Sequence, residues 1–68
     1  MSLIDARGLS CPEPVILLRK AMASKEEHYE MLVDNHAAKE NTSRYAKSQG
    51  YEVTVTKTNG EYKLVFKK

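Results

Sequence analysis

The sequence predicts an α+β fold, a two-layer α/β sandwich in which a four-stranded mixed sheet carries two helices on one face. Segments of strand-like alternation and of helical periodicity follow one another in the order β-α-β-α-β-β. A right-handed crossover then places both helices on the same side of the sheet. The 68 residues are enough for one domain, 1–68, with a single thin core.

The first half of the chain predicts a strand, a helix and a second strand. Leu3–Asp5 is expected to form a short strand that ends before the turn at Gly8. Pro12 suits the first position of the following helix, because that position needs no backbone N–H. The helix should end near Ser24–Glu27, and Tyr29–Val33 is the next strand. At helical spacing, the buried stripe of the helix is expected to hold Val15, Leu17, Leu18, Ala21 and Met22.

The second half predicts a helix and a β-hairpin. The helix runs roughly over His36–Ser48, and either Asp34 or Asn35 can cap it by accepting a backbone N–H of its first turn. Asn59-Gly60 predicts a type I′ turn, since both residues tolerate positive φ. The two alternating strands that this turn joins are expected at Tyr51–Lys57 and Glu61–Lys67.

Composition and the length of the apolar stretches bear on several classes of protein. Eleven Lys and Arg residues nearly balance nine Asp and Glu residues, whereas a nucleic-acid-binding module usually shows a concentrated basic stripe. The longest apolar stretch, Val15–Leu18, is far too short to span a membrane. Asp5 and Arg7 stand where a signal peptide would need an apolar core, so a cytoplasmic location is expected.

Neither a disulfide nor a metal site is expected. The chain has one cysteine, which excludes an internal disulfide. Cys11, His28 and His36 also lack the paired spacing of zinc ligands. We therefore expect no metal and no bound cofactor.

Cys11 is the candidate reactive group. It stands at or next to the start of the first helix, where the positive end of the helix dipole stabilises a thiolate. Pro12 and Pro14 remove two first-turn donors and Glu13 adds a negative charge, so we expect only a modest lowering of the thiol pKa from about 8.5. A lone cysteine can also be inert core filler. Bracketing by Gly8 and the two prolines favours an exposed thiol.

The segment Asp5–Val15 resembles the signature of the TusA-like family, which includes the TusA, SirA and YedF proteins. In that family a short strand leads through Asp-x-x-Gly-Leu-x-Cys-Pro-x-Pro into a helix that carries an Arg-Lys or Lys-Lys pair, matched here by Arg19-Lys20. Asp34-Asn35 matches the acidic segment after the second strand, so the resemblance covers the whole chain. The second half, including Gln49–Val53, is closest to the N-terminal domain of YedF proteins linked to selenium metabolism.

The resemblance implies a sulfur carrier that holds sulfur as a persulfide on Cys11. A cysteine desulfurase would donate the sulfur, and a DsrE-like or other acceptor protein would take it for tRNA thiolation or for sulfur or selenium metabolism. Such a protein is a sulfurtransferase-type carrier that turns over only with its partners, and it meets nucleic acid only indirectly. Transfer by thiolate attack needs an exposed, partly ionised thiol and no cofactor.

Ile16, Arg19 and Lys20 fall outside the buried stripe and are candidates for partner docking, together with Arg7. Cations steer encounters and an apolar residue anchors them, although a solvated helix face is the alternative. Two other functions remain open: a non-catalytic interaction or regulatory domain, and a small RNA-binding module of the same fold. The variant Cys11→Ser separates sulfur carriage from RNA binding, since it abolishes sulfur carriage and leaves RNA binding intact.

Overall fold

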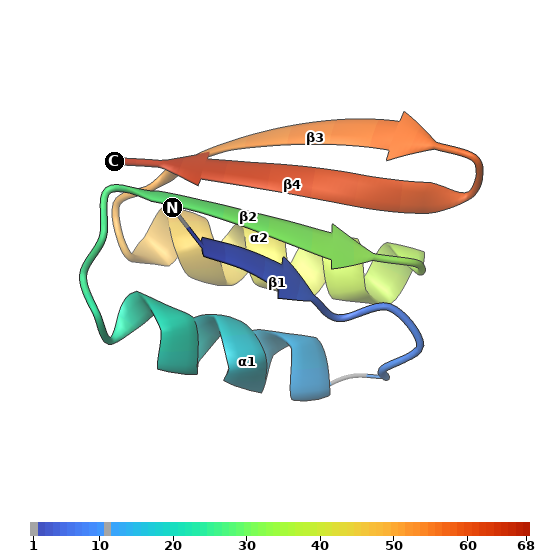
Figure 1. Cartoon of the computed structure of the whole chain (residues 1–68), viewed down its shortest axis with the longest axis horizontal. Coiled ribbons are helices and arrows are strands. Elements are labelled where there is room, and N and C mark those ends of the chain that lie inside the picture. The colour runs from blue at the N-terminus through green and yellow to red at the C-terminus, as the bar shows by residue number, and fades with distance from the viewer. Residues whose placement is uncertain (1, 11) are drawn as a thin grey trace.

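The computed structural model describes residues 2–10 and 12–68. Its elements follow the predicted order β-α-β-α-β-β and share two layers, with the sheet on one side and the helices on the other (Figure 1). Their bounds are Ser2–Asp5 for β1, Glu13–Met22 for α1, His28–Val33 for β2, His36–Ser48 for α2, Glu52–Thr58 for β3 and Glu61–Lys67 for β4.

The four strands form one mixed sheet in the order β1-β2-β4-β3. The pair β1–β2 is parallel, as expected for strands joined through a helix, while β2–β4 and β3–β4 are antiparallel. Both helices cover the same face of this sheet (Figure 1). The predicted fold class is therefore confirmed.

The core lies between the sheet and the helices and follows strand alternation. Tyr29, Met31 and Val33 of β2 are fully buried, and so are Leu64 and Phe66 of β4. The register places Met31 opposite Leu64 and Tyr29 opposite Phe66, so these side chains line one face of the two central strands. The other residues buried with them are Ala6, Pro14, Leu18, Met22, Ala38, Thr42, Ala46 and Tyr51.

Helix α1 begins one residue later than predicted, and its buried face is shifted. Pro12 is the N-cap, because its carbonyl accepts the N–H of Ile16 at 3.1 Å. Pro14, Leu18 and Met22 are buried at a spacing of four residues. Val15 is only half-buried, so its expected place in the buried stripe is taken by Pro14.

Helix α2 and the hairpin agree with the prediction. Asn35 caps α2 by accepting the N–H of Ala38 at 2.8 Å. Asn59 and Gly60 have φ values of 50° and 78°, as a type I′ turn requires. Val55 points to the helix side of the sheet but is 41% exposed, because β3 is an edge strand.

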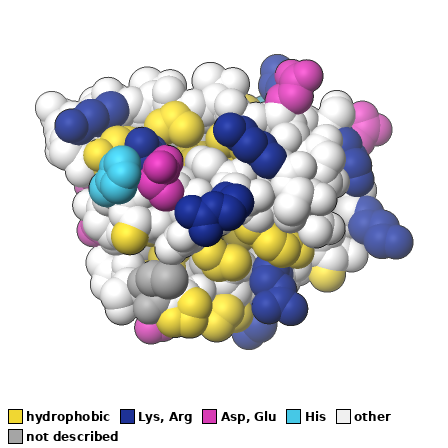
Figure 2. Space-filling model, turned by 180° about the vertical axis from the view of Figure 1, so that it is seen from behind, with side chains coloured by type: hydrophobic (Ala, Val, Ile, Leu, Met, Phe, Trp, Pro, Cys, Tyr) yellow, Lys and Arg dark blue, Asp and Glu magenta, His cyan; other side chains and the backbone are white. Residues whose placement is uncertain are grey.

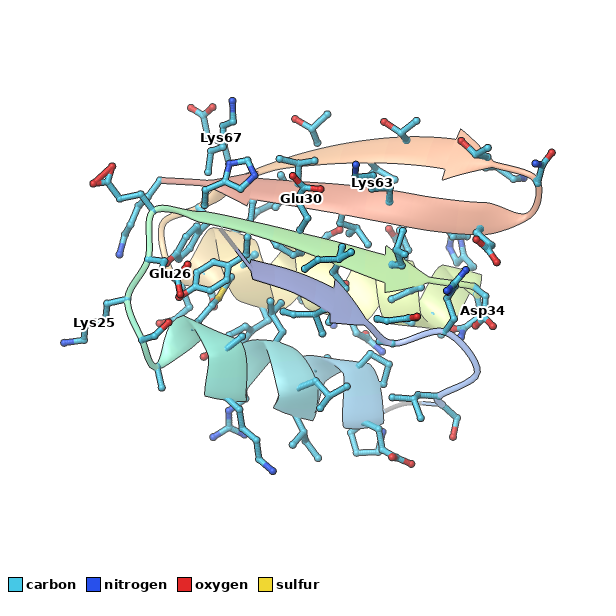
Figure 3. The ribbon with its side chains drawn as sticks, in the orientation of Figure 1. Lys25, Glu26, Glu30, Asp34, Lys63 and Lys67 are labelled. Carbon is cyan, nitrogen blue, oxygen red and sulfur yellow. The ribbon has the colours of Figure 1, made fainter. Side chains whose placement is uncertain are left out.

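The open face of the sheet carries an ion-pair cluster. Glu30 on β2 is only 17% exposed and contacts Lys63 Nζ at 3.1 Å and His28 Nε2 at 3.1 Å; Figure 3 shows Glu30 and Lys63 on neighbouring strands. The hydrogen bond with His28, followed by that with Lys63, lowers the pKa of Glu30. This cluster covers the centre of the face that the helices leave open.

Within residues 2–10 and 12–68, neither helix is long and apolar enough to cross a membrane.

Candidate functional site

The candidate site is the end of the molecule where the loop after β1 enters α1. Cys11, the predicted sulfur-accepting residue, lies outside the described residues, but its neighbours do not. Ser10 and Glu13, on either side of it, are joined by a hydrogen bond from the Glu13 N–H to the Ser10 carbonyl at 2.9 Å. Ser10, Pro12 and Glu13 are exposed, whereas Pro14 is buried and fixes the first turn of the helix on the sheet.

The loop before Cys11 starts at a buried residue that continues the pairing of β1 with β2. Ala6 is fully buried, and its N–H donates to the carbonyl of Leu32 on β2 at 2.8 Å, which extends the pairing of β1 by one residue. Gly8 then has a φ of 79° in the left-handed region, which residues with a side chain rarely adopt. The sequence therefore turns sharply at Gly8 because no Cβ opposes that conformation.

Arg7, a predicted docking residue, is engaged by carboxylates of its own chain. Its guanidinium contacts Asp5 at 2.8 Å and Glu61 at 3.4 Å, and its side chain is 42% exposed. The hydrogen bonds from Arg7 lower the pKa of Asp5 to about 2, and those same contacts raise the pKa of Arg7. Arg7 thus ties the loop to the start of β4, a link between residues 54 positions apart.

Asp34 and Asn35 hold the same loop from the other side. Asp34 Oδ2 accepts the N–H of Gly8 at 2.8 Å, and Asn35 Nδ2 donates to the carbonyl of Leu9 at 3.3 Å. Figure 3 shows Asp34 at the end of β2, beside this loop. The resemblance marks both positions, and capping was predicted for one of them, but nothing in the sequence spacing shows that they bind the loop.

The predicted docking residues of α1 line a groove on the helix side. Ile16 is 39% exposed, and Arg19 and Lys20 are exposed beside it. The groove has a volume of about 700 Å³ and also meets Lys25 and Tyr45, so three cations and no carboxylate line it. Within the described chain, neither Arg19 nor Lys20 forms an ion pair with another residue.

A second groove of about 400 Å³ lies between the two helices, near the start of α1. Pro12 and Val15 of the α1 end and Arg44 and Tyr45 of α2 line it, so Tyr45 borders both grooves. Figure 2, which views the molecule from the side of α2, shows hydrophobic side chains between several Lys and Arg side chains on this surface. Tyr45 is half-buried, so it packs against the core and also forms part of this surface.

The described residues hold no group of three or more His, Cys, Asp and Glu side chains that could bind a metal ion. His28 lies on the open face of the sheet, where it pairs with Glu30. His36 lies at the start of α2, where its Nε2 is 3.9 Å from Glu40.

Comparison with known proteins identifies the family. The family model for Sulfurtransferase TusA matches residues 2–68. A candidate sulfur carrier protein of Methanocaldococcus jannaschii is 34% identical over 71 residues, which cover 100% of this chain and 95% of the relative. Another candidate sulfur carrier protein, from Archaeoglobus fulgidus, is 42% identical over 55 residues, or 78% of this chain and 71% of the relative.

A solved structure agrees with this result. The crystal structure of a SirA-like protein from Desulfitobacterium hafniense matches with a TM-score of 0.89 and 35% sequence identity, and the match covers 98% of this chain and 96% of that one. Fold, motif and family match thus coincide over nearly the whole chain, and the chain belongs to the TusA family.

Proposed function

We propose that the protein is a sulfur carrier that holds sulfur as a persulfide on Cys11. The observation that carries the proposal is the family match over residues 2–68, in a chain with a single cysteine. Relatives described as candidate sulfur carriers support the role. The exposed neighbours Ser10, Pro12 and Glu13 support access of a partner to this segment.

The transfer chemistry needs only thiols. The Cys11 thiol first loses its proton, and the thiolate attacks the terminal sulfur of a persulfide on the donor. A new S–S bond forms on Cys11 as the S–S bond of the donor breaks, and the donor leaves as a thiolate that can take up a proton. No oxidant or reductant is consumed, and delivery to an acceptor thiol repeats the same step in the opposite direction.

The partners in this proposal are a cysteine desulfurase as donor and a DsrE-like or other protein as acceptor. Ile16, Arg19 and Lys20 form the surface that we assign to docking, because they are exposed beside one groove and no acidic side chain lines it. Arg7 is a weaker docking candidate, since Asp5 and Glu61 already engage it. The acceptor sets the destination of the sulfur, and the proposed destinations are tRNA thiolation and sulfur or selenium metabolism.

A two-stage transfer experiment tests the relay. The protein is incubated with a cysteine desulfurase, pyridoxal phosphate and cysteine labelled with radioactive sulfur, and is then separated from the desulfurase. We expect label on the native protein that a reductant releases, and transfer of that label to an added DsrE-like protein. Absence of label on the native protein, while the desulfurase itself is labelled, would contradict the proposal.

A further inference from the structure

Two adjacent side chains tie the loop that leads to Cys11 to the end of a central strand of the sheet. Asp34 and Asn35, here called the Asp34–Asn35 clamp, follow directly on β2, which is paired on both sides within the sheet. The clamp makes two bonds to the loop, to the N–H of Gly8 and the carbonyl of Leu9. Leu9 is two positions before Cys11, so the clamp fixes the backbone close to the reactive residue.

The two side chains also brace each other. Asn35 Nδ2 donates to Asp34 Oδ1 at 3.3 Å as well as to Leu9, while Asn35 Oδ1 accepts the Ala38 N–H. One amide thus joins the start of α2 to the loop, with its oxygen serving the helix and its nitrogen serving the loop. The Ser10–Glu13 hydrogen bond joins the residues before and after position 11, and the buried Pro14 holds the start of the helix that follows.

We propose that Asp34 and Asn35 are positioning residues for sulfur transfer: they hold the loop at Gly8 and Leu9, shortly before Cys11, in the conformation from which transfer proceeds. This role rests on the proposed function. Asp34 and Asn35 act on sulfur transfer through their hydrogen bonds to Gly8 and Leu9. In-line attack is sensitive to position, and a displacement of about 1 Å can reduce a rate by about a hundredfold. Groups that hold a reactive residue on a rigid element therefore control the rate without touching the reacting atoms.

The chain offers variants that separate positioning from stability. Asp34→Ala removes the acceptor for the Gly8 N–H, whereas Asp34→Asn keeps an oxygen that can accept it. Asn35→Ser keeps a good N-cap for α2 but removes the amide that donates to Leu9. Tyr51→Phe is the matched control, because it removes a 2.7 Å hydrogen bond to the Glu26 carbonyl at the opposite end of the molecule.

Three readouts are compared at a temperature where every variant is folded: the rate of sulfur loading by a cysteine desulfurase, the pH profile of alkylation by iodoacetamide, and the melting temperature. We expect Asp34→Ala and Asn35→Ser to load sulfur at least about tenfold more slowly than the native protein, because the attacking atom is displaced. Iodoacetamide is small and attacks from any direction, so its pH profile should stay native. Asp34→Asn should recover most of the loading rate, and Tyr51→Phe should load normally despite its lower melting temperature.

Native loading rates in Asp34→Ala and Asn35→Ser would overturn the proposal. So would a fall in loading that follows the melting temperature across all variants, the Tyr51→Phe control included. A shifted alkylation profile would also overturn it, because the clamp would then act on thiol ionisation and not on position. Failure of the native protein to accept sulfur would instead overturn the proposed function, so the two failures are distinguishable.

Discussion

Reversal of the two exposed cations on α1 should slow sulfur loading without unfolding the protein. In the variant Arg19→Glu with Lys20→Glu, both substituted side chains are exposed and outside the buried positions Pro14, Leu18 and Met22. Each reversal changes the charge by two units, so the formal net charge falls from +2 to −2. Charges at the rim of an interface mainly affect the association rate and its salt dependence.

The size of the effect follows from Coulomb's law and screening. Two unit charges about 10 Å apart in water interact by about 0.4 kcal/mol, which screening reduces to about 0.3 kcal/mol at about 0.01 M salt and about 0.15 kcal/mol at about 0.1 M. Over four units of charge, each partner carboxylate at that distance contributes about 1.2 kcal/mol at the lower salt concentration and about 0.6 kcal/mol at the higher one. Loading should therefore slow by about eightfold and about threefold, respectively, per partner carboxylate.

The assay is the second-order rate of sulfur loading by a cysteine desulfurase, measured at both salt concentrations. The matched control is Lys57→Glu with Lys67→Glu, which makes the same change in net charge on the β3–β4 hairpin, at two exposed positions outside α1. The control should reduce the rate much less, and both double variants should melt near the native temperature. Native loading by the α1 variant, or equal slowing in both double variants, would refute docking through Arg19 and Lys20.

Four further predictions test other parts of the account. Leu18→Ala removes a fully buried side chain and should cost about 2–5 kcal/mol of unfolding free energy, or at least about 8 °C in Tm, in a thermal melt. Ile16→Asp, at a position 39% exposed, should keep Tm near native and weaken the complex with a desulfurase at any salt concentration; a collapsed Tm would place Ile16 on the buried side. Because the pKa of Asp5 is lowered to about 2, the contribution of Asp5 to stability is present above about pH 4 and is lost as the pH falls through about 2. In the variant Arg7→Gln, NMR titration should show the pKa of Asp5 returning toward 3.8. The pH midpoint of the rate at which iodoacetamide alkylates Cys11 should lie modestly below the pKa of a free thiol, about 8.5. Protection of Cys11 from alkylation until denaturant is added would place the residue in the core.

Most of the fold could be predicted from the sequence because its signals are local. Alternation along β2 and β4 predicts which face of each strand is buried, and Met31 and Leu64 are fully buried opposite each other. Asn59-Gly60 predicted the hairpin from its two positive φ values. The exposure of Val55 could not be predicted, since strand alternation does not tell which strand forms the edge beyond the helices.

The site was less accessible to sequence reasoning because its contacts are long-range. The sequence marks Cys11, Pro12 and Pro14 by their local pattern, but the pairing of Arg7 with Glu61 exists only once β4 lies beside β2. The bonds from the Asp34–Asn35 clamp to the loop likewise depend on β1 pairing with β2. The motif around Cys11 can therefore be recognised in the sequence, whereas the contacts that hold the loop depend on the order in which the strands pair.

The mass of the intact protein after sulfur loading tests the central claim most directly. The native protein and Cys11→Ser are each incubated with a cysteine desulfurase, cysteine and pyridoxal phosphate, and are then analysed without reductant. The account predicts that the native protein gains the mass of one sulfur atom, that a reductant removes it, and that Cys11→Ser gains none. The same gain in Cys11→Ser, or no gain in the native protein beside a persulfide-loaded desulfurase, would contradict a sulfur carrier that works through Cys11.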